Sequence, residues 1–265
     1  MKAVLSGKEM KAFDTRSIKG YGIPSLVLME RAAMAVSEQA EQILKKEQAE
    51  TVWSVCGFGN NGADGVAAAR MLFLKGYDVK IVFPQRDGKG SEELETQLNI
   101  VKRLGIPVMT AEDLPTSGGE RTPVNPFAEK KEKRHACRSV ILDAVFGIGL
   151  SRNVEGAYKT LIEWINAQED MKTIAVDIPS GISSDTGEVM GAAVRADVTV
   201  TFGMKKLGQV LFPGREFCGH LLVEDVGFVP ESDAEREKHV QMLDEEDLAR
   251  IPARMPDSNK GTYGK

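Results

Sequence analysis

Residues 51–84 read TVWSVCGFGNNGADGVAAARMLFLKGYDVKIVFP and contain two apolar runs on either side of a helix-forming segment. Residues 51–56 have the length and the Val- and Trp-containing composition of a strand that is buried on both faces. Residues 66–75 are rich in Ala and Leu, which favour helix, and the second apolar run at 79–83 is typical of another strand. Strand, glycine-rich loop (57–65), helix and strand in this order form the crossover unit of a parallel sheet.

The loop at residues 57–65 carries more polar side chains than a phosphate-binding loop requires. Its first six residues match the spacing G-x-G-x-x-G, but the dinucleotide fingerprint also needs an acidic residue at the end of the second strand. Residues 82–85, VFPQ, contain no carboxylate, which argues against an ordinary NAD(P) oxidoreductase. Asn60, Asn61 and Asp64 favour a polar ligand bound through side chains, or a hard cation. The alternative is that they only form turns or cap the helix.

The overall composition limits the class of protein. The chain has 265 residues, a hydrophobic fraction of 42% and a formal net charge of −5, which suits one large α/β domain and gives no sign of nucleic-acid or membrane binding. No apolar run is long enough to span a bilayer, and the first residues reach a charge early, so we expect no membrane segment and no signal peptide. Cys56, Cys137 and Cys218 are odd in number and widely spaced, which predicts reduced thiols and a cytoplasmic location.

The remainder of the chain continues the alternation of helices and strands. Further helices are expected at residues 6–17, 25–48, 91–104 and 158–166, and further strands at 106–109, 139–150 (with its exit loop), 173–181, 196–202 and 221–226. This pattern predicts an α/β fold: a Rossmann-like, three-layer α/β/α sandwich with a mostly parallel sheet, preceded by two N-terminal helices. Residues 115–138 are charged and have no apolar period, which predicts a surface insertion or a short solvated helix.

Two acidic residues end predicted strands. Asp143 ends one apolar run and Asp177 ends another, and the carboxyl ends of parallel strands are where open α/β sheets bind ligands. If these strands are neighbours of the first strand, Asn61, Asp143 and Ser180 lie around one point. Their oxygens are typical ligands of a hard cation, and no His or Cys accompanies them, which argues against zinc. The alternative for either carboxylate is that it braces a loop or caps a helix.

Three motifs resemble those of a known family. GFGNNGADG at residues 57–65, LDAVFGIGL at 142–150 and VDIPSG at 176–181 are similar, in this order, to the motifs of the YjeF N-terminal domain family, which comprises the NAD(P)H-hydrate epimerases. TFGMKK at 201–206 also resembles the family's Phe-Gly-x-x-Lys segment. The resemblance covers residues 8–229 and implies that the protein interconverts the R and S epimers of hydrated NADH and NADPH (NADHX and NADPHX), which are damaged forms of the cofactor.

The resemblance also implies roles for individual residues. Asp177 would face the hydrated nicotinamide as the catalytic residue. Asn61, Asp143 and Ser180 would hold a potassium ion, the same three residues that the strand ends suggest for a hard cation. The residues expected around the hydrated dinucleotide are Asn60, Asn61, Gly62, Ala63, Asp64, Gly147, Ile148, Gly149, Leu150, Ser151, Arg152, Asn153, Asp177 and Lys206.

Two positions depart from the family pattern. Ala63 replaces a usual glycine, so its backbone must have a negative φ. Lys206 lacks the flanking prolines, which weakens it as a contact for phosphate or for proton transfer.

An alternative function is a non-catalytic YjeF-type nucleotide-binding or scaffold domain, as in mRNA-decapping enhancer proteins. The joint presence of Asn61, Asp143 and Asp177 favours an enzyme.

The C-terminal residues carry a second resemblance. Residues 256–265, PDSNKGTYGK, are similar to the opening of the ADP- or ATP-dependent NAD(P)H-hydrate dehydratase domain. We therefore expect a YjeF N-terminal (epimerase) domain at 1–229, followed at 230–265 by a linker and the start of a truncated dehydratase domain. The longer, bifunctional protein would also dehydrate S-NAD(P)HX with ADP or ATP. The resemblance further implies a homodimer formed through the N-terminal helices, with a small-molecule substrate and no nucleic-acid partner.

Overall fold

The fold is described from a computed structural model that covers residues 2–85, 88–114 and 139–243, together with 247, 249, 256 and 257. The chain divides into two compact units. The larger is Leu5–Pro230, and the smaller joins Met1–Val4 to Glu231–Lys265. The insertion predicted at 115–138 and almost all of the segment that resembles a dehydratase domain, 256–265, lie outside the described residues.

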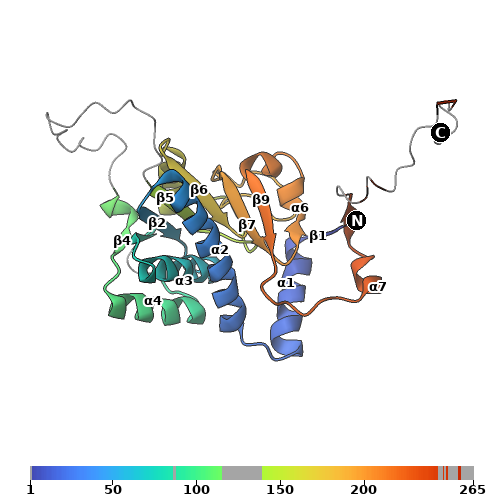
Figure 1. The fold of residues 1–265 in the computed structure, drawn as a ribbon, viewed down its shortest axis with the longest axis horizontal. Coiled ribbons are helices and arrows are strands. Elements are labelled where there is room, and N and C mark those ends of the chain that lie inside the picture. Colours follow the sequence, from blue (N-terminus) through green and yellow to red (C-terminus); the bar gives the residue numbers. More distant parts are fainter. Residues whose placement is uncertain are drawn as a thin grey trace. The chain divides into compact units, whose positions relative to one another are not determined.

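A seven-stranded sheet forms the centre of the larger unit (Figure 1). Its strand order is β4-β3-β2-β5-β6-β7-β9, and every neighbouring pair is parallel. From the central pair β2 and β5, the chain adds β3 and β4 on one side and β6, β7 and β9 on the other. This is the doubly wound arrangement that the alternation of helices and strands predicted. The strands are β2 Thr51–Cys56, β3 Asp78–Phe83, β4 Val108–Thr110, β5 Ser139–Ala144, β6 Met171–Val176, β7 Val198–Phe202 and β9 His220–Glu224.

The alternating side chains of the strands create two hydrophobic cores, one on each face of the sheet. From β2, Val52 and Cys56 join the core beneath α2, α3 and α4, whereas Trp53 and Val55 join the core beneath α5. These layers confirm the predicted α/β/α sandwich. The helices of the unit are α1 Gly7–Thr15, α2 Ser25–Glu47, α3 Asn60–Leu74, α4 Glu92–Leu104, α5 Gly156–Asn166 and α6 Leu207–Val210, with a π-helical turn at Arg16–Gly20 and 3-10 turns at Ala111–Asp113 and Gly214–Phe217.

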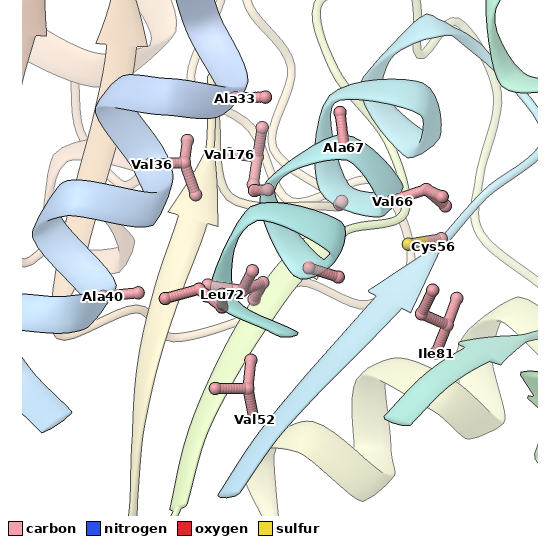
Figure 2. Close-up of a cluster of buried hydrophobic side chains, with 14 of the residues drawn as sticks. Ala33, Val36, Ala40, Val52, Cys56, Val66, Ala67, Leu72, Ile81 and Val176 are labelled. Carbon is pink, nitrogen blue, oxygen red and sulfur yellow. The ribbon is translucent and has the colours of Figure 1, made fainter. Parts of the chain in front are cut away.

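Small side chains let α2 and α3 pack closely against each other and the sheet. Figure 2 shows Ala33 and Ala40 of α2 on the same side as Val36, facing α3 and the sheet, where Ala67 and Leu72 lie. All five are fully buried. Because alanine adds little bulk, the two helices bury a continuous apolar layer against the sheet. This packing holds the first turn of α3 at the carboxyl end of β2.

The glycine-rich loop after β2 is shorter than the sequence predicted. We predicted a loop to residue 65, but α3 begins at Asn60, with Gly59 as its N-cap. Asn60 and Asn61 are tolerated here because the first turn of a helix has no intrahelical partners for its N–H groups. Ala63 lies inside this helix, and it is not among the described residues with positive φ, so its methyl group causes no backbone strain.

The smaller unit contains all but the last residue of β1 (Lys2–Leu5), which pairs antiparallel with β10 (Val240–Met242), with Lys2 opposite Met242 and Val4 opposite Val240. A short helix, α7 (Asp233–Arg236), precedes β10. The sequence predicted only a linker in this region and did not predict a strand at the N-terminus. In the part of the chain that the structure describes, no helix combines the length and apolarity that crossing a bilayer requires.

Candidate active site at the carboxyl ends of the strands

A cavity of about 590 Å³ opens at the carboxyl ends of the central strands, within the Leu5–Pro230 unit. Its volume is in the range of sites that hold a cofactor-sized ligand. The first turn of α3 and the loop after β5 form two of its walls, and α1 and α2 contribute others. Its lining includes Met10, Lys11, Asp14, Ser25, Leu28, Met29, Phe58, Asn60, Asn61, Asp64, Glu93, Phe146, Gly147, Ile148, Gly149, Leu150, Ser151, Arg152, Tyr158, Asp177, Phe202, Lys206 and Phe228.

Glycines bring the first turn of α3 against the strand ends. A Cβ at Gly57 would collide with the carbonyl of Val145, and a Cβ at Gly62 would collide with the carbonyl of Gly57. A Cβ at Gly65 would collide with the side chain of Ala144 at the end of β5. These glycines therefore serve close packing, which places the side chains of the first helical turn at the cavity.

Asn61 is one of those side chains, and its hydrogen bonding is incomplete. The side chain lies against the backbone of Gly147, where an added Cβ would be 3.3 Å from Asn61 Oδ1. Its Nδ2 atom is buried and has no partner among the described residues. Buried polar atoms are almost always hydrogen-bonded in native proteins. Because the orientation of an amide is assigned from its partners, the orphan position can equally hold the amide oxygen. Asn61 therefore carries a buried, unpartnered polar atom beside Gly147.

Asp143 lies beneath the cavity at the end of β5, and it is fully buried. Its Oδ1 accepts a hydrogen bond from Ser180 Oγ at 2.5 Å, and its Oδ2 accepts one from the Ser180 amide at 2.8 Å. Burial raises the pKa of Asp143 to about 6, and the hydrogen bonds from Ser180 and the Val145 amide only partly offset this. No Lys or Arg of the described chain forms an ion pair with this carboxylate.

Ser180 connects this buried carboxylate to the cavity wall. Its Oγ accepts a hydrogen bond from the Phe146 amide at 2.8 Å. Phe146 and Gly147 follow β5 and line the cavity, with Gly147 against Asn61. The structure thus brings Asn61, Asp143 and Ser180 together around one loop, as their strand-end positions suggested.

Asp177 follows β6 directly and lines the same cavity. Its φ is +68°, a left-handed conformation that is rare outside glycine and typically costs about 1–3 kcal/mol. Its Oδ1 accepts hydrogen bonds from Lys206 Nζ at 2.5 Å and from Thr201 Oγ1 at 3.2 Å. Lys206 is only 1% exposed, so this is a buried ion pair. The Lys206 ammonium group therefore contacts Asp177 directly.

The cavity has an acidic side and two aromatic surfaces. Burial, followed by the charges of Asp177, Asp14 and Glu93, raises the pKa of Asp64 well above its ordinary value. On the apolar surfaces, the Phe58 ring stacks on Phe83 with 5.1 Å between centroids, and the rings of Phe146 and Tyr158 lie 4.8 Å apart. Flat aromatic walls with a few polar groups suit a planar heterocycle.

Most of the residues predicted to contact substrate line this cavity, but three do not. Gly62 and Ala63 are buried within α3, and Asn153 is exposed beyond the cavity-lining loop. We expected the N-terminal helices to form a dimer contact, and the sequence did not predict that α1 and α2 contribute to the cavity. Met10 and Asp14 of α1 are four residues apart, which places them on one helix face, but this spacing alone does not reveal a cavity.

The comparisons with known proteins agree with these motifs. The family described as YjeF-related protein N-terminus matches residues 25–208, well over half of the chain. The chain belongs to this family. It is 40% identical over 221 residues to the NAD(P)H-hydrate epimerase of Limosilactobacillus fermentum, covering 83% of this chain and 95% of that protein. It is 38% identical over 224 residues to the NAD(P)H-hydrate epimerase of Oenococcus oeni, covering 84% of this chain and 96% of that protein.

A longer member of the family and a solved structure complete the comparison. The bifunctional NAD(P)H-hydrate repair enzyme Nnr of Thermofilum pendens is 37% identical over 257 residues, which are 97% of this chain and 46% of that protein. The chain therefore spans about half the length of this YjeF-related relative. The crystal structure of the yeast protein ynu0 shares the fold, with a TM-score of 0.68, 20% identity, and coverage of 91% of this chain and 96% of that one.

Proposed function

We propose that the Leu5–Pro230 unit is an NAD(P)H-hydrate epimerase, which interconverts the R and S forms of hydrated NADH and NADPH. The observation that carries the proposal is Asp177, a carboxylate held at the wall of a cofactor-sized cavity. The relatives named NAD(P)H-hydrate epimerase match this chain over nearly their whole length. An intact acidic site of this kind argues against the alternative of a non-catalytic scaffold domain.

The chemistry requires a group that can take up and return a proton. The hydrated ring carries its hydroxyl on the carbon next to the ring nitrogen, and epimerisation there proceeds by ring opening or by loss and return of the hydroxyl. Ring opening begins when an acceptor removes the hydroxyl proton and ends when that proton returns. Loss of the hydroxyl instead needs a proton donor for the leaving oxygen and an acceptor when water adds back, so neither route consumes a proton overall. Asp177 is the proposed acceptor, because its carboxylate lies at the cavity wall and is held there by Lys206.

We also propose that a potassium ion binds at Asn61, Asp143 and Ser180. Two observations support the fit: Asn61 has a buried polar atom without a partner, and Asp143 is a fully buried carboxylate without a cationic partner among the described residues. Amide, carboxylate and hydroxyl oxygens are ligands of a hard cation. When bound, the ion would neutralise Asp143, and this would support the Phe146–Gly147 segment that borders the cavity.

A coupled assay tests the proposed activity. An S-specific dehydratase with its nucleotide consumes the S form of a mixed NADH hydrate and leaves the R form to epimerise spontaneously. Adding this protein is expected to accelerate consumption of the remaining R form. Asp177→Asn is expected to reduce the added rate about 10²–10⁴-fold. Glu188→Gln, which changes an exposed carboxylate, is the matched control and keeps the rate of the wild type. A wild-type rate equal to spontaneous epimerisation would disprove the proposal.

The wider assignments are proposals of the same kind. A longer protein that continues beyond this chain would add an ADP- or ATP-dependent dehydratase, in line with the bifunctional relative. We further propose that the protein acts in the cytoplasm and that it is a homodimer. Size-exclusion chromatography with light scattering tests the dimer, since a monomeric mass at micromolar concentration would contradict it.

A further inference from the structure

Asp177 has a backbone conformation that its surroundings must hold in place. Besides Gln48 at the end of α2, it is the only non-glycine residue with positive φ in the described part of the chain. Gln48 is a helix C-cap, where left-handed geometry is common. Asp177 instead follows a strand, so its conformation must be stabilised by tertiary contacts.

Gln209 makes the contact that holds the Asp177 backbone. Its Nε2 donates to the Asp177 carbonyl at 2.6 Å, and its Oε1 accepts from the Lys206 amide at 2.8 Å. The side chain is 1% exposed. The Asp177 amide in turn donates to the Val200 carbonyl at 2.8 Å. Gln209 therefore connects the backbones of the two members of the buried ion pair.

Thr201 and Lys206 hold the Asp177 side chain. Lys206 Nζ donates to Asp177 Oδ1 at 2.5 Å, to Thr201 Oγ1 at 2.7 Å and to the Phe202 carbonyl at 3.1 Å. These three acceptors use all three N–H bonds of the ammonium group. Lys206 is thus engaged with the protein, which leaves it no donor for a substrate phosphate in this arrangement.

The two carboxylate oxygens of Asp177 consequently differ in their hydrogen bonding. Oδ1 accepts from both Lys206 and Thr201, whereas no described residue donates to Oδ2. Because the backbone and Oδ1 are both fixed, rotation of the carboxylate is restricted. Oδ2 is then the oxygen that remains for a ligand in the cavity.

We propose that Gln209, Thr201 and Lys206 are positioning residues, which fix Asp177 so that Oδ2 receives the substrate proton. The inference rests on the proposed epimerase function and extends it to residues outside the cavity surface, since Gln209 and Thr201 do not line it. It predicts that changes at Thr201 and Gln209 alter kcat while leaving KM nearly unchanged, because neither residue contacts substrate.

A matched pair at Thr201 tests the hydroxyl. Thr201→Val preserves shape and removes the hydroxyl, whereas Thr201→Ser keeps it. In the coupled assay, we expect Thr201→Val to lower kcat about tenfold with KM within about twofold, and Thr201→Ser to retain most of the wild-type kcat. Equal activity of Thr201→Val and wild type, or equal loss in both variants, would overturn the role of the hydroxyl.

A second pair at Gln209 tests the backbone contact. Gln209→Glu keeps the acceptor for the Lys206 amide but loses the donor to Asp177, and Gln209→Met loses both. We expect kcat to fall about 100-fold in each, and crystal structures to show that Asp177 leaves its positive φ or that its carboxylate rotates. If Asp177 keeps its positive φ and its carboxylate orientation in both crystal structures, the inference is overturned even if the wild type has no epimerase activity. An inactive wild type with displaced Asp177 would instead disprove only the proposed function.

Discussion

Asp143 and Asp177 belong to neighbouring strand ends of one sheet, yet the protein compensates their charges differently. Asp177 has a lysine partner built into the fold, and it borders the cavity. Asp143 is more deeply buried, and among the described residues its hydrogen-bond donors are Ser180 and the Val145 amide. The fold itself supplies a cation to Asp177, whereas Asp143 has no cationic partner among the described residues and burial raises its pKa to about 6. The first arrangement suits chemistry, and the second suits a structural ion site.

The largest expected effect is on stability, when the internal cation is removed. Lys206→Met removes the cationic partner of Asp177, and breaking a buried ion pair costs about 3–5 kcal/mol. Lys172→Met is the matched control, because Lys172 pairs with Asp197 at the surface, where such pairs contribute only about 0–1 kcal/mol. Urea unfolding measures both. The double variant with Asp177→Asn should recover most of the loss, and equal losses for the two lysines would contradict the comparison.

A smaller effect is expected when a cation is supplied to Asp143. If potassium binds the proposed site, we expect it at ten times its dissociation constant to stabilise the folded protein by about 1.4 kcal/mol, which corresponds to a few degrees in Tm. Tetramethylammonium at the same ionic strength should give no such rise. Asp143→Asn should abolish the potassium effect, and Asp177→Asn should keep it. A rise that survives in Asp143→Asn would place the ion elsewhere.

The smallest expected effect is a change in the stability of the folded protein with pH, measured in buffers without potassium or sodium. Because burial raises the pKa of Asp143 to about 6, the folded chain binds that proton more tightly than the unfolded chain. The wild type therefore loses stability as pH rises from about 4 to about 6, and the loss persists above pH 6. Asp143→Asn removes the cost of burying the charged carboxylate but weakens the hydrogen bonds from Ser180. We therefore expect the free energy of unfolding of Asp143→Asn to exceed that of the wild type by about 1 kcal/mol at pH 8 and not to exceed it at pH 4.5. Differential scanning calorimetry at the two pH values measures it, and an equal change at both would exclude the carboxyl group as its cause.

Local patterns predicted most of the elements correctly. The capping box of Ser6 and Glu9 starts α1, Ser91 caps α4, and β2 has the residues expected of it. Such signals depend on neighbouring residues, so they can be read without knowing the fold. The start of α3 was placed too late, because Gly and Asn are poor helix formers and only packing of its first turn against the strand ends makes them helical.

The sequence by itself determined the alternation of strands and helices, and with it the edge of the sheet where Asn61, Asp143 and Asp177 would gather. Only the tertiary structure decided which groups neutralise or bind them. Ser180 reaches Asp143 across 37 positions of the chain, and Gln209 reaches Asp177 across 32. The physical reason is that hydrophobic periodicity acts over a few residues, whereas these contacts depend on strand order and on the loops that bring distant segments together.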